Sequence, residues 1–184
     1  MINREEAIIL LKKYLKDEEN ISYSLAVEAI MKEMAKRLDR DEELWGLTGL
    51  LHNLDYEYTS SEPEKRGTLS AQLLEDLLPE RCVNAIKANN YMHTDYIPAT
   101  SLDKSLIAAD AVAGLIIVTA QSMTSKKLAD VDLETFMNRF YDSSFATRYN
   151  RSKIQLCADI GIELDAFLEL SLNTLKQISD KINL

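Results

Sequence analysis

Three polar residues lie in stretches of the sequence that are otherwise apolar, and they are its clearest candidates for chemistry. His52 and Asn53 follow a run without formal charge, and Asp110 is the only formal charge between Lys104 and Lys126. A buried ionised carboxylate is costly unless a cation or several hydrogen-bond donors lie beside it. We therefore expect one of two arrangements. Either His52 and Asp110 share a polar site, or each is satisfied separately, by a backbone carbonyl and by a neighbouring hydroxyl or Lys.

Other common catalytic arrangements are missing from the sequence. It contains no GxSxG elbow, P-loop, dinucleotide fingerprint, CxxC pair or HExxH motif, and it has only two His. The two cysteines, Cys82 and Cys157, have no metal-binding spacing, and each stands in an apolar helical pattern. We expect both to be small core residues with free thiols.

The charge and hydropathy of the chain limit its partners. The net charge is −9, which argues against nucleic acid, because phosphate backbones bind clustered Lys and Arg. A local basic pocket for one small phosphate is compatible with this charge. The most apolar stretch, 105–125, contains Asp110 and many small residues, so we expect a buried central helix and no membrane span. Residues 1–6 show no secretory signal pattern, so we expect a cytoplasmic protein.

The composition favours helices over strands. Only five Gly and three Pro interrupt 184 residues, and apolar residues recur with a helical period. We expect an all-α fold in a single domain spanning residues 1–184. The expected helices are 5–16, Asn20 or Ser22 to 38, Asp41 to 54, 60–64 to 77 or 78, 79–90, 102–121, 132–141, and two C-terminal helices that separate near Gly161. Residues 44–54 carry no formal charge, so their helix should be buried nearly all round.

Several segments carry a resemblance to a known family. They are SLAVEAIM at 24–31, LLHNLDYE at 50–57, AIKANNY at 85–91, DKSLIAAD at 103–110, SKKLADV at 125–131 and DSSFA at 142–146. In this order they resemble the HD superfamily of metal-dependent phosphohydrolases, over roughly residues 20–160. The resemblance implies an HD-type helical bundle.

The resemblance also implies where the family's metal ligands would fall. The family holds one or two divalent metals with a His, a His-Asp pair, further His and a distal Asp, and the metals activate water against a phosphate ester. The corresponding positions here are Tyr23, His52, Asn53, Arg66, Asn89 and Asp110. Only His52 and Asp110 keep the expected residue type. The sequence thus predicts a degenerate site.

Two strong ligands do not make a tight divalent site, so we expect no metal cofactor. The alternative is one divalent metal ion bound by His52, Asp110 and His93. His93 lies four residues after Asn89 and would share a helix face with it if that helix continued. The other interpretation of His93 is a surface residue beside a loop.

Cations near the implied cleft suggest what replaced the metal. Arg66 could pair with Asp110 and supply the charge that the carboxylate requires, or it could be solvated. Lys126 and Lys127 line a phosphate pocket if the family segment is matched correctly; otherwise they form a solvated basic turn.

Three functions follow from these expectations. The first is a degenerate HD domain that binds a small ligand, including a phosphorylated one, or a partner at the former active-site cleft without metal-dependent hydrolysis. The second is a metal-dependent phosphohydrolase acting on a nucleotide or other phosphate ester with an atypical ligand set. The third is a helical interaction module whose cleft has closed. The sequence leaves open whether the chain forms a homo-oligomer.

Overall fold

The computed structural model describes residues 1–184 as helices joined by short loops, with no β-strand, which confirms the all-α prediction. The α-helices are α1 (Arg4–Tyr14), α2 (Glu18–Arg37), α3 (Glu42–Leu51), α4 (Thr68–Leu74), α5 (Glu80–Asn89), α6 (Ser101–Ser122), α7 (Leu133–Tyr141), α8 (Arg151–Gln155) and α9 (Leu164–Gln177). Four single turns of 3-10 helix are η1 (Pro63–Lys65), η2 (Leu128–Asp130), η3 (Ala158–Ile160) and η4 (Ser179–Lys181).

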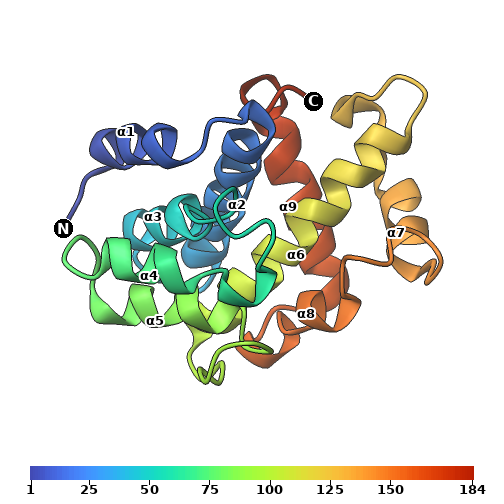
Figure 1. Ribbon diagram of the computed structural model, residues 1–184. Helices are drawn as coiled ribbons and strands as arrows, with labels where there is room; N and C mark the ends of the chain where they lie inside the picture. Colours follow the sequence, from blue (N-terminus) through green and yellow to red (C-terminus); the bar gives the residue numbers. More distant parts are fainter.

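Helix α6 runs through the middle of the molecule, with α2 to α5 on one side and α7 and α8 on the other, while α9 crosses behind it and packs against both α2 and α6 (Figure 1). It packs against α2, α3, α5, α7, α8 and α9. By length and composition α6 could cross a membrane, but most of it is buried inside the fold, as in the core helix of a globular protein. Its start is fixed by a capping box between Thr100 and Asp103.

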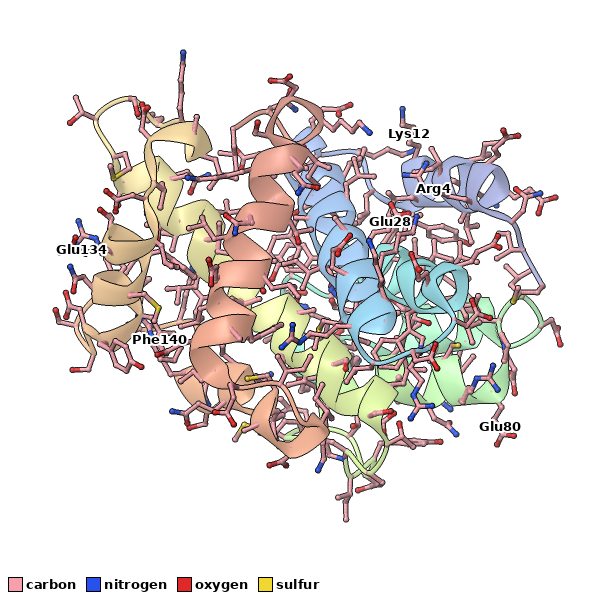
Figure 2. The ribbon with its side chains drawn as sticks, turned by 180° about the vertical axis from the view of Figure 1, so that it is seen from behind. Arg4, Lys12, Glu28, Glu80, Glu134 and Phe140 are labelled. Carbon is pink, nitrogen blue, oxygen red and sulfur yellow. The ribbon has the colours of Figure 1, made fainter.

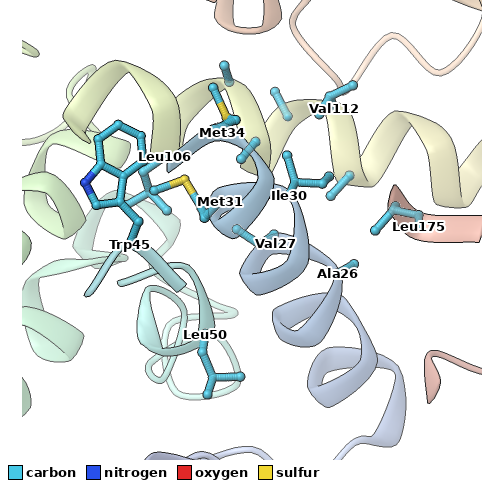
Figure 3. Close-up of a cluster of buried hydrophobic side chains, with 14 of the residues drawn as sticks. Ala26, Val27, Ile30, Met31, Met34, Trp45, Leu50, Leu106, Val112 and Leu175 are labelled. Atoms are coloured by element: carbon cyan, nitrogen blue, oxygen red, sulfur yellow. The ribbon is translucent and has the colours of Figure 1, made fainter. Parts of the chain in front are cut away.

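One apolar cluster extends from the N-terminal residues to those after α9. In Figure 3, Val27, Ile30 and Met31 of α2 lie between Trp45 of α3 and Val112 of α6. The uncharged stretch of α3 is buried on all sides, as its composition predicts. Both cysteines are buried with free thiols, which confirms that prediction too.

Close contact between α2 and α3 depends on a glycine. A Cβ at Gly49 would lie 2.9 Å from Cγ of Met31 and 3.0 Å from the carbonyl oxygen of Val27. Because no side chain separates the two backbones here, α3 ends deep in the core. His52, which follows α3 directly, is consequently placed at the centre of the bundle.

The expected single helix from 60–64 to 77 or 78 is wrong. The segment instead forms η1, a turn at Gly67 with a φ of 84°, and α4. The cause is non-local, because the Asp55 carboxylate accepts hydrogen bonds from the backbone N–H groups of Gly67 and Ser70, at 2.8 and 3.0 Å. Asp55 thus caps the start of α4 from outside the segment, and the interruption determines where Arg66 lies.

The start of α2 also differs from the prediction. Asp17, rather than Asn20 or Ser22, caps it by accepting from the N–H of Glu19. Farther along α2, Glu28 is buried and pairs with Arg4 at 2.6 Å and Lys32 at 2.8 Å. Figure 2 shows Arg4 reaching from α1 toward Glu28. This ion pair attaches α1 to the helical core.

Gly67 and Gly161 allow a controlled test of the turn that positions Arg66. Both have a φ of 84°, but a Cβ at Gly67 would lie 2.9 Å from the carbonyl oxygen of Ile86, whereas one at Gly161 meets nothing within 4 Å. Gly161→Ala should cost about 1 kcal/mol for the left-handed backbone alone. Gly67→Ala should lower the free energy of unfolding by at least about 1 kcal/mol more than Gly161→Ala does, because the carbonyl oxygen of Ile86 belongs to the backbone and cannot move away from the new methyl group. Urea unfolding measures both costs, and equal losses would contradict the close approach.

Candidate functional site

A cavity of about 500 Å³ opens beside α6, and it brings most of the candidate residues together. Its wall is formed by α2, the turn after α3, the end of α5, the middle of α6 and the segment 148–153. Tyr23, Asn53, Arg66, Asn89 and Asp110 all line it. A smaller cavity of about 100 Å³ adjoins it, and there His52 joins the lining.

The Asp110 carboxylate accepts hydrogen bonds from three donors on three different elements. Its Oδ1 lies 2.8 Å from the hydroxyl of Tyr23 and 3.2 Å from Nε2 of His52. Its Oδ2 lies 3.1 Å from Nδ2 of Asn89. All three donors stand at positions where the sequence places family metal ligands. The first of the two expected arrangements, a shared polar site, is therefore the one that the structure has.

His52 is held from both sides of its ring. Nδ1 lies 2.6 Å from the carbonyl oxygen of Gly49, and Nε2 faces the Asp110 carboxylate. Both ring nitrogens therefore face oxygen atoms of the protein. The side chain is 1% exposed, so water does not compete for these contacts.

The site holds two strongly shifted pKa values. Burial alone would raise the pKa of Asp110, but the hydrogen bond and charge of His52, with the hydrogen bonds from Tyr23 and Asn89, hold it well below its usual range. Burial raises the pKa of Tyr23 well above its usual value, and the neighbouring Asp110 charge adds to this effect. Tyr23 is accordingly a neutral hydrogen-bond donor and Asp110 an ionised acceptor.

Arg66 does not pair with Asp110, so that expectation is wrong. Its guanidinium carbon instead lies 4.2 Å from the centroid of the Tyr56 ring. Arg66 lies in the turn between η1 and α4, and the donors from α2, α3 and α5 already occupy the carboxylate. The Nε atom of Arg66 is buried and has no hydrogen-bond partner. It is an unused donor in the wall of both cavities.

Three other candidates lie outside the cavity. Lys126 and Lys127 are exposed and do not belong to its lining, which contradicts their expected place in a phosphate pocket. Helix α5 ends at Asn89, and the turn that follows takes the exposed His93 into a separate surface depression. His93 therefore does not join His52 and Asp110, and the alternative metal set is wrong.

The sequence analysis missed the residues that form the opposite wall. Arg148, Tyr149 and Asn150, from the segment that leads into α8, line the cavity together with Lys153 of α8. A signal was present, because Arg148, Arg151 and Lys153 place three cations within six residues of a chain whose net charge is −9. No local pattern in the sequence relates this cluster to His52.

Arg151 holds this wall in place. Its guanidinium donates to the carbonyl oxygens of Arg139, Phe140, Asp142, Phe145, Ala146 and Tyr149. Burial lowers the pKa of Arg151. The Tyr149 ring in turn rests on α6 at Gly114, where a Cβ would lie 2.0 Å from a ring carbon. The segment 142–150 is thus fixed to α6 at one end and to Arg151 along its length.

Comparison with known proteins agrees with this arrangement. A family model described as HD domain matches residues 21–115, which is more than half of the chain. The chain belongs to the HD-domain family. The match includes all six positions from Tyr23 to Asp110 but stops before α7, so it does not extend to residue 160 as the sequence resemblance does. No curated protein matches the chain, and no solved structure matches it.

The metal chemistry associated with this family does not fit the side chains present. No group of three or more His, Cys, Asp or Glu is arranged to hold a metal ion. His52 directs one nitrogen at a carbonyl and the other at Asp110, and both oxygens of Asp110 are engaged by protein donors. A divalent ion would have to displace these contacts and would gain only one imidazole and one carboxylate.

The lowered pKa of Asp110 predicts a specific acid sensitivity. A depressed folded-state pKa gives stability that is complete above the pKa of an unfolded Asp, about 3.9, and is lost as the pH falls toward the folded value. The free energy of unfolding of the parent should therefore approach that of Asp110→Asn between about pH 5 and about pH 3, below the range in which histidines titrate. Urea unfolding at several pH values measures the difference.

The control for this experiment is Asp95→Asn, since Asp95 is exposed and makes no ion pair. The difference in unfolding free energy between Asp95→Asn and the parent should stay nearly constant over the same pH range. A constant difference for Asp110→Asn as well would show that the three donors do not stabilise an ionised carboxylate.

Proposed function

We propose that this chain is an HD domain that binds a small phosphorylated ligand in the cavity beside α6 and does not hydrolyse it with a metal. The observation that carries the proposal is the guanidinium of Arg66, which lines the cavity and makes no ion pair or side-chain hydrogen bond within the protein. Its Nε is covered by protein atoms, so the terminal nitrogens are the donors that a ligand in the cavity can reach. A phosphate oxygen is the acceptor that guanidinium groups bind best.

The charges around the cavity support an anionic ligand. Arg66, Arg148 and Lys153 line it, against the two carboxylates of Glu19 and Asp110. The three cations outnumber these two carboxylates. Electrostatic attraction would also compensate for the net charge of −9, which otherwise repels anions from the surface.

The proposal excludes hydrolysis because of the state of Asp110 and His52. The lowered pKa of Asp110 makes its carboxylate a weak base, and its two oxygens are occupied. His52 faces acceptors at both nitrogens, so it has no free lone pair with which to accept a proton from water. The pair is suited to holding the cavity wall rather than to activating a nucleophile.

A metal-dependent phosphohydrolase is the alternative function. Membership of the HD-domain family and the retained His52 and Asp110 favour it. It requires a divalent ion to rearrange the hydrogen bonds of Asp110 described above.

Arg66→Met should weaken the binding of a phosphate monoester by about ten- to a hundredfold, because a charged hydrogen bond is lost. Stability should change by no more than about 1 kcal/mol, since Arg66 makes no ion pair in the free protein. Calorimetric titration with a panel of phosphate monoesters and unfolding curves measure the two effects. Arg37→Met is the control, since Arg37 is exposed and ends α2, fourteen residues from Tyr23. Equal binding by both variants would contradict the proposal.

Metal content separates the proposal from its alternative. We expect the purified protein to contain far less than one Zn, Mn, Fe or Ni per chain and to show no phosphatase turnover with added Mn²⁺, Co²⁺ or Mg²⁺. The combined variant Tyr23→His, Asn53→Asp, Arg66→His and Asn89→His should gain metal by elemental analysis. One metal per parent chain, lost in His52→Ala, or turnover lost in Asp110→Ala, would establish the hydrolase instead.

A further inference from the structure

Amide side chains are unusually frequent around the main cavity. Asn20, Asn53, Asn89, Gln121 and Asn150 all line it, and they come from five different parts of the fold. Each amide offers both a donor and an acceptor. A phosphate group offers mainly acceptors, so it can use the N–H₂ groups and the cations but cannot satisfy the amide oxygens.

Several of these polar groups have no partner in the protein. The Oδ1 acceptor of Asn89 is buried and unpaired, while its Nδ2 binds Asp110. Asn53 is 7% exposed and its amide makes no hydrogen bond to the protein. The unused Nε donor of Arg66 lies in the same wall, and all three residues also border the smaller cavity. The residues that border the smaller cavity therefore keep unpaired donors and acceptors, of which the amide of Asn53 is the one not fully covered.

Hydroxyl groups suit this combination because each donates one hydrogen bond and accepts others. The cavity offers fewer free aromatic faces on which an aromatic base could stack. The Tyr56 ring already has the Arg66 guanidinium 4.2 Å from its centroid, and the Tyr149 ring has that of Arg148 at 4.8 Å. The hydroxyl of Tyr23 is committed to Asp110. One face of two of the three tyrosines is thus covered before any ligand enters.

We infer that the ligand is a phosphorylated polyol or sugar, whose phosphate meets Arg66 and whose hydroxyls meet the amides of Asn53 and Gln121. This inference rests on the proposed binding of a phosphorylated ligand and specifies its class. A cavity of about 500 Å³ is large enough for a sugar monophosphate with some retained water. A site that pairs a buried amide with a hydroxyl discriminates strongly against a ligand that lacks it.

The test compares matched esters by calorimetric titration of the whole chain. Glycerol phosphate is paired with propyl phosphate, and glucose phosphate, esterified at the primary hydroxyl, with cyclohexylmethyl phosphate. Each pair differs in its hydroxyls, with a ring oxygen as the one further difference in the second. At least one hydroxylated ester should bind about tenfold tighter or more than its counterpart, the equivalent of one well-made hydrogen bond.

Two variants distinguish the contacts made by the ligand's hydroxyls from those made by its phosphate. Asn53→Leu should bring the affinities within a pair close together, because it removes a partner of the hydroxyls and breaks no hydrogen bond of the free protein. Arg66→Met should weaken both members of a pair equally and leave their ratio unchanged. If Asn53→Leu fails to fold, Gln121→Leu replaces it, since Gln121 is exposed and lines the same cavity.

The remaining outcomes distinguish this inference from the proposed function. If the hydroxyl-free esters bind as tightly as their partners, or adenosine monophosphate binds tighter than both hydroxylated esters, the polyol assignment is overturned and phosphate binding stands. If none of the esters binds, the proposed function fails and the inference fails with it.

Discussion

Asp110 places a carboxylate in the middle of the most apolar helix of the chain, and much of the structure around α6 serves to keep it ionised. Removing a carboxylate from water costs several kcal/mol unless donors replace the lost hydration. Here the donors are Tyr23 from α2, His52 from the end of α3 and Asn89 from the end of α5. One charge therefore connects four helices at the centre of the bundle.

The three side chains that contact Asp110 also occupy the position where a metal ion would bind. A metal site would leave open coordination positions for water and substrate, whereas here three protein side chains contact the carboxylate, two at Oδ1 and one at Oδ2. The cations that line the cavity do not contact Asp110, and Arg66 retains an unused donor. The fold of the HD family is kept, and at its centre Tyr23, His52 and Asn89 surround the carboxylate of Asp110.

The cavity is completed by a part of the chain outside the region that the HD family model matches. The match ends at residue 115, in the middle of α6, yet Arg148, Tyr149 and Lys153 form one wall. The position of this wall depends on the Arg151 guanidinium and on the absence of a side chain at Gly114. Backbone carbonyls satisfy Arg151 in place of a carboxylate, so the segment is ordered by a single side chain. Family membership accordingly describes the base of the site and not its full lining.

Local patterns in the sequence determined the helices. The uncharged run of α3 predicted its complete burial, the small and apolar residues of α6 predicted a central helix, and Asp41 and Asp132 begin the helices that they cap. These features depend on residues within a few positions of one another, so they can be read without the fold. The six positions from Tyr23 to Asp110 also came from the sequence, through a family resemblance that fixes their order.

Only the tertiary structure decided which of these side chains touch. The break at Gly67 depends on Asp55, twelve residues away, and the partners of Asp110 come from residues 87, 58 and 21 positions distant in the sequence. Arg66 carries a charge that could pair with Asp110, but it lies against the Tyr56 ring after the turn at Gly67, and Tyr23, His52 and Asn89 contact the carboxylate instead. The residue type determines which kind of hydrogen-bond or charged partner a side chain requires. The packing of helices decides which neighbour provides it, because hydrogen bonds and ion pairs act only over a few ångströms.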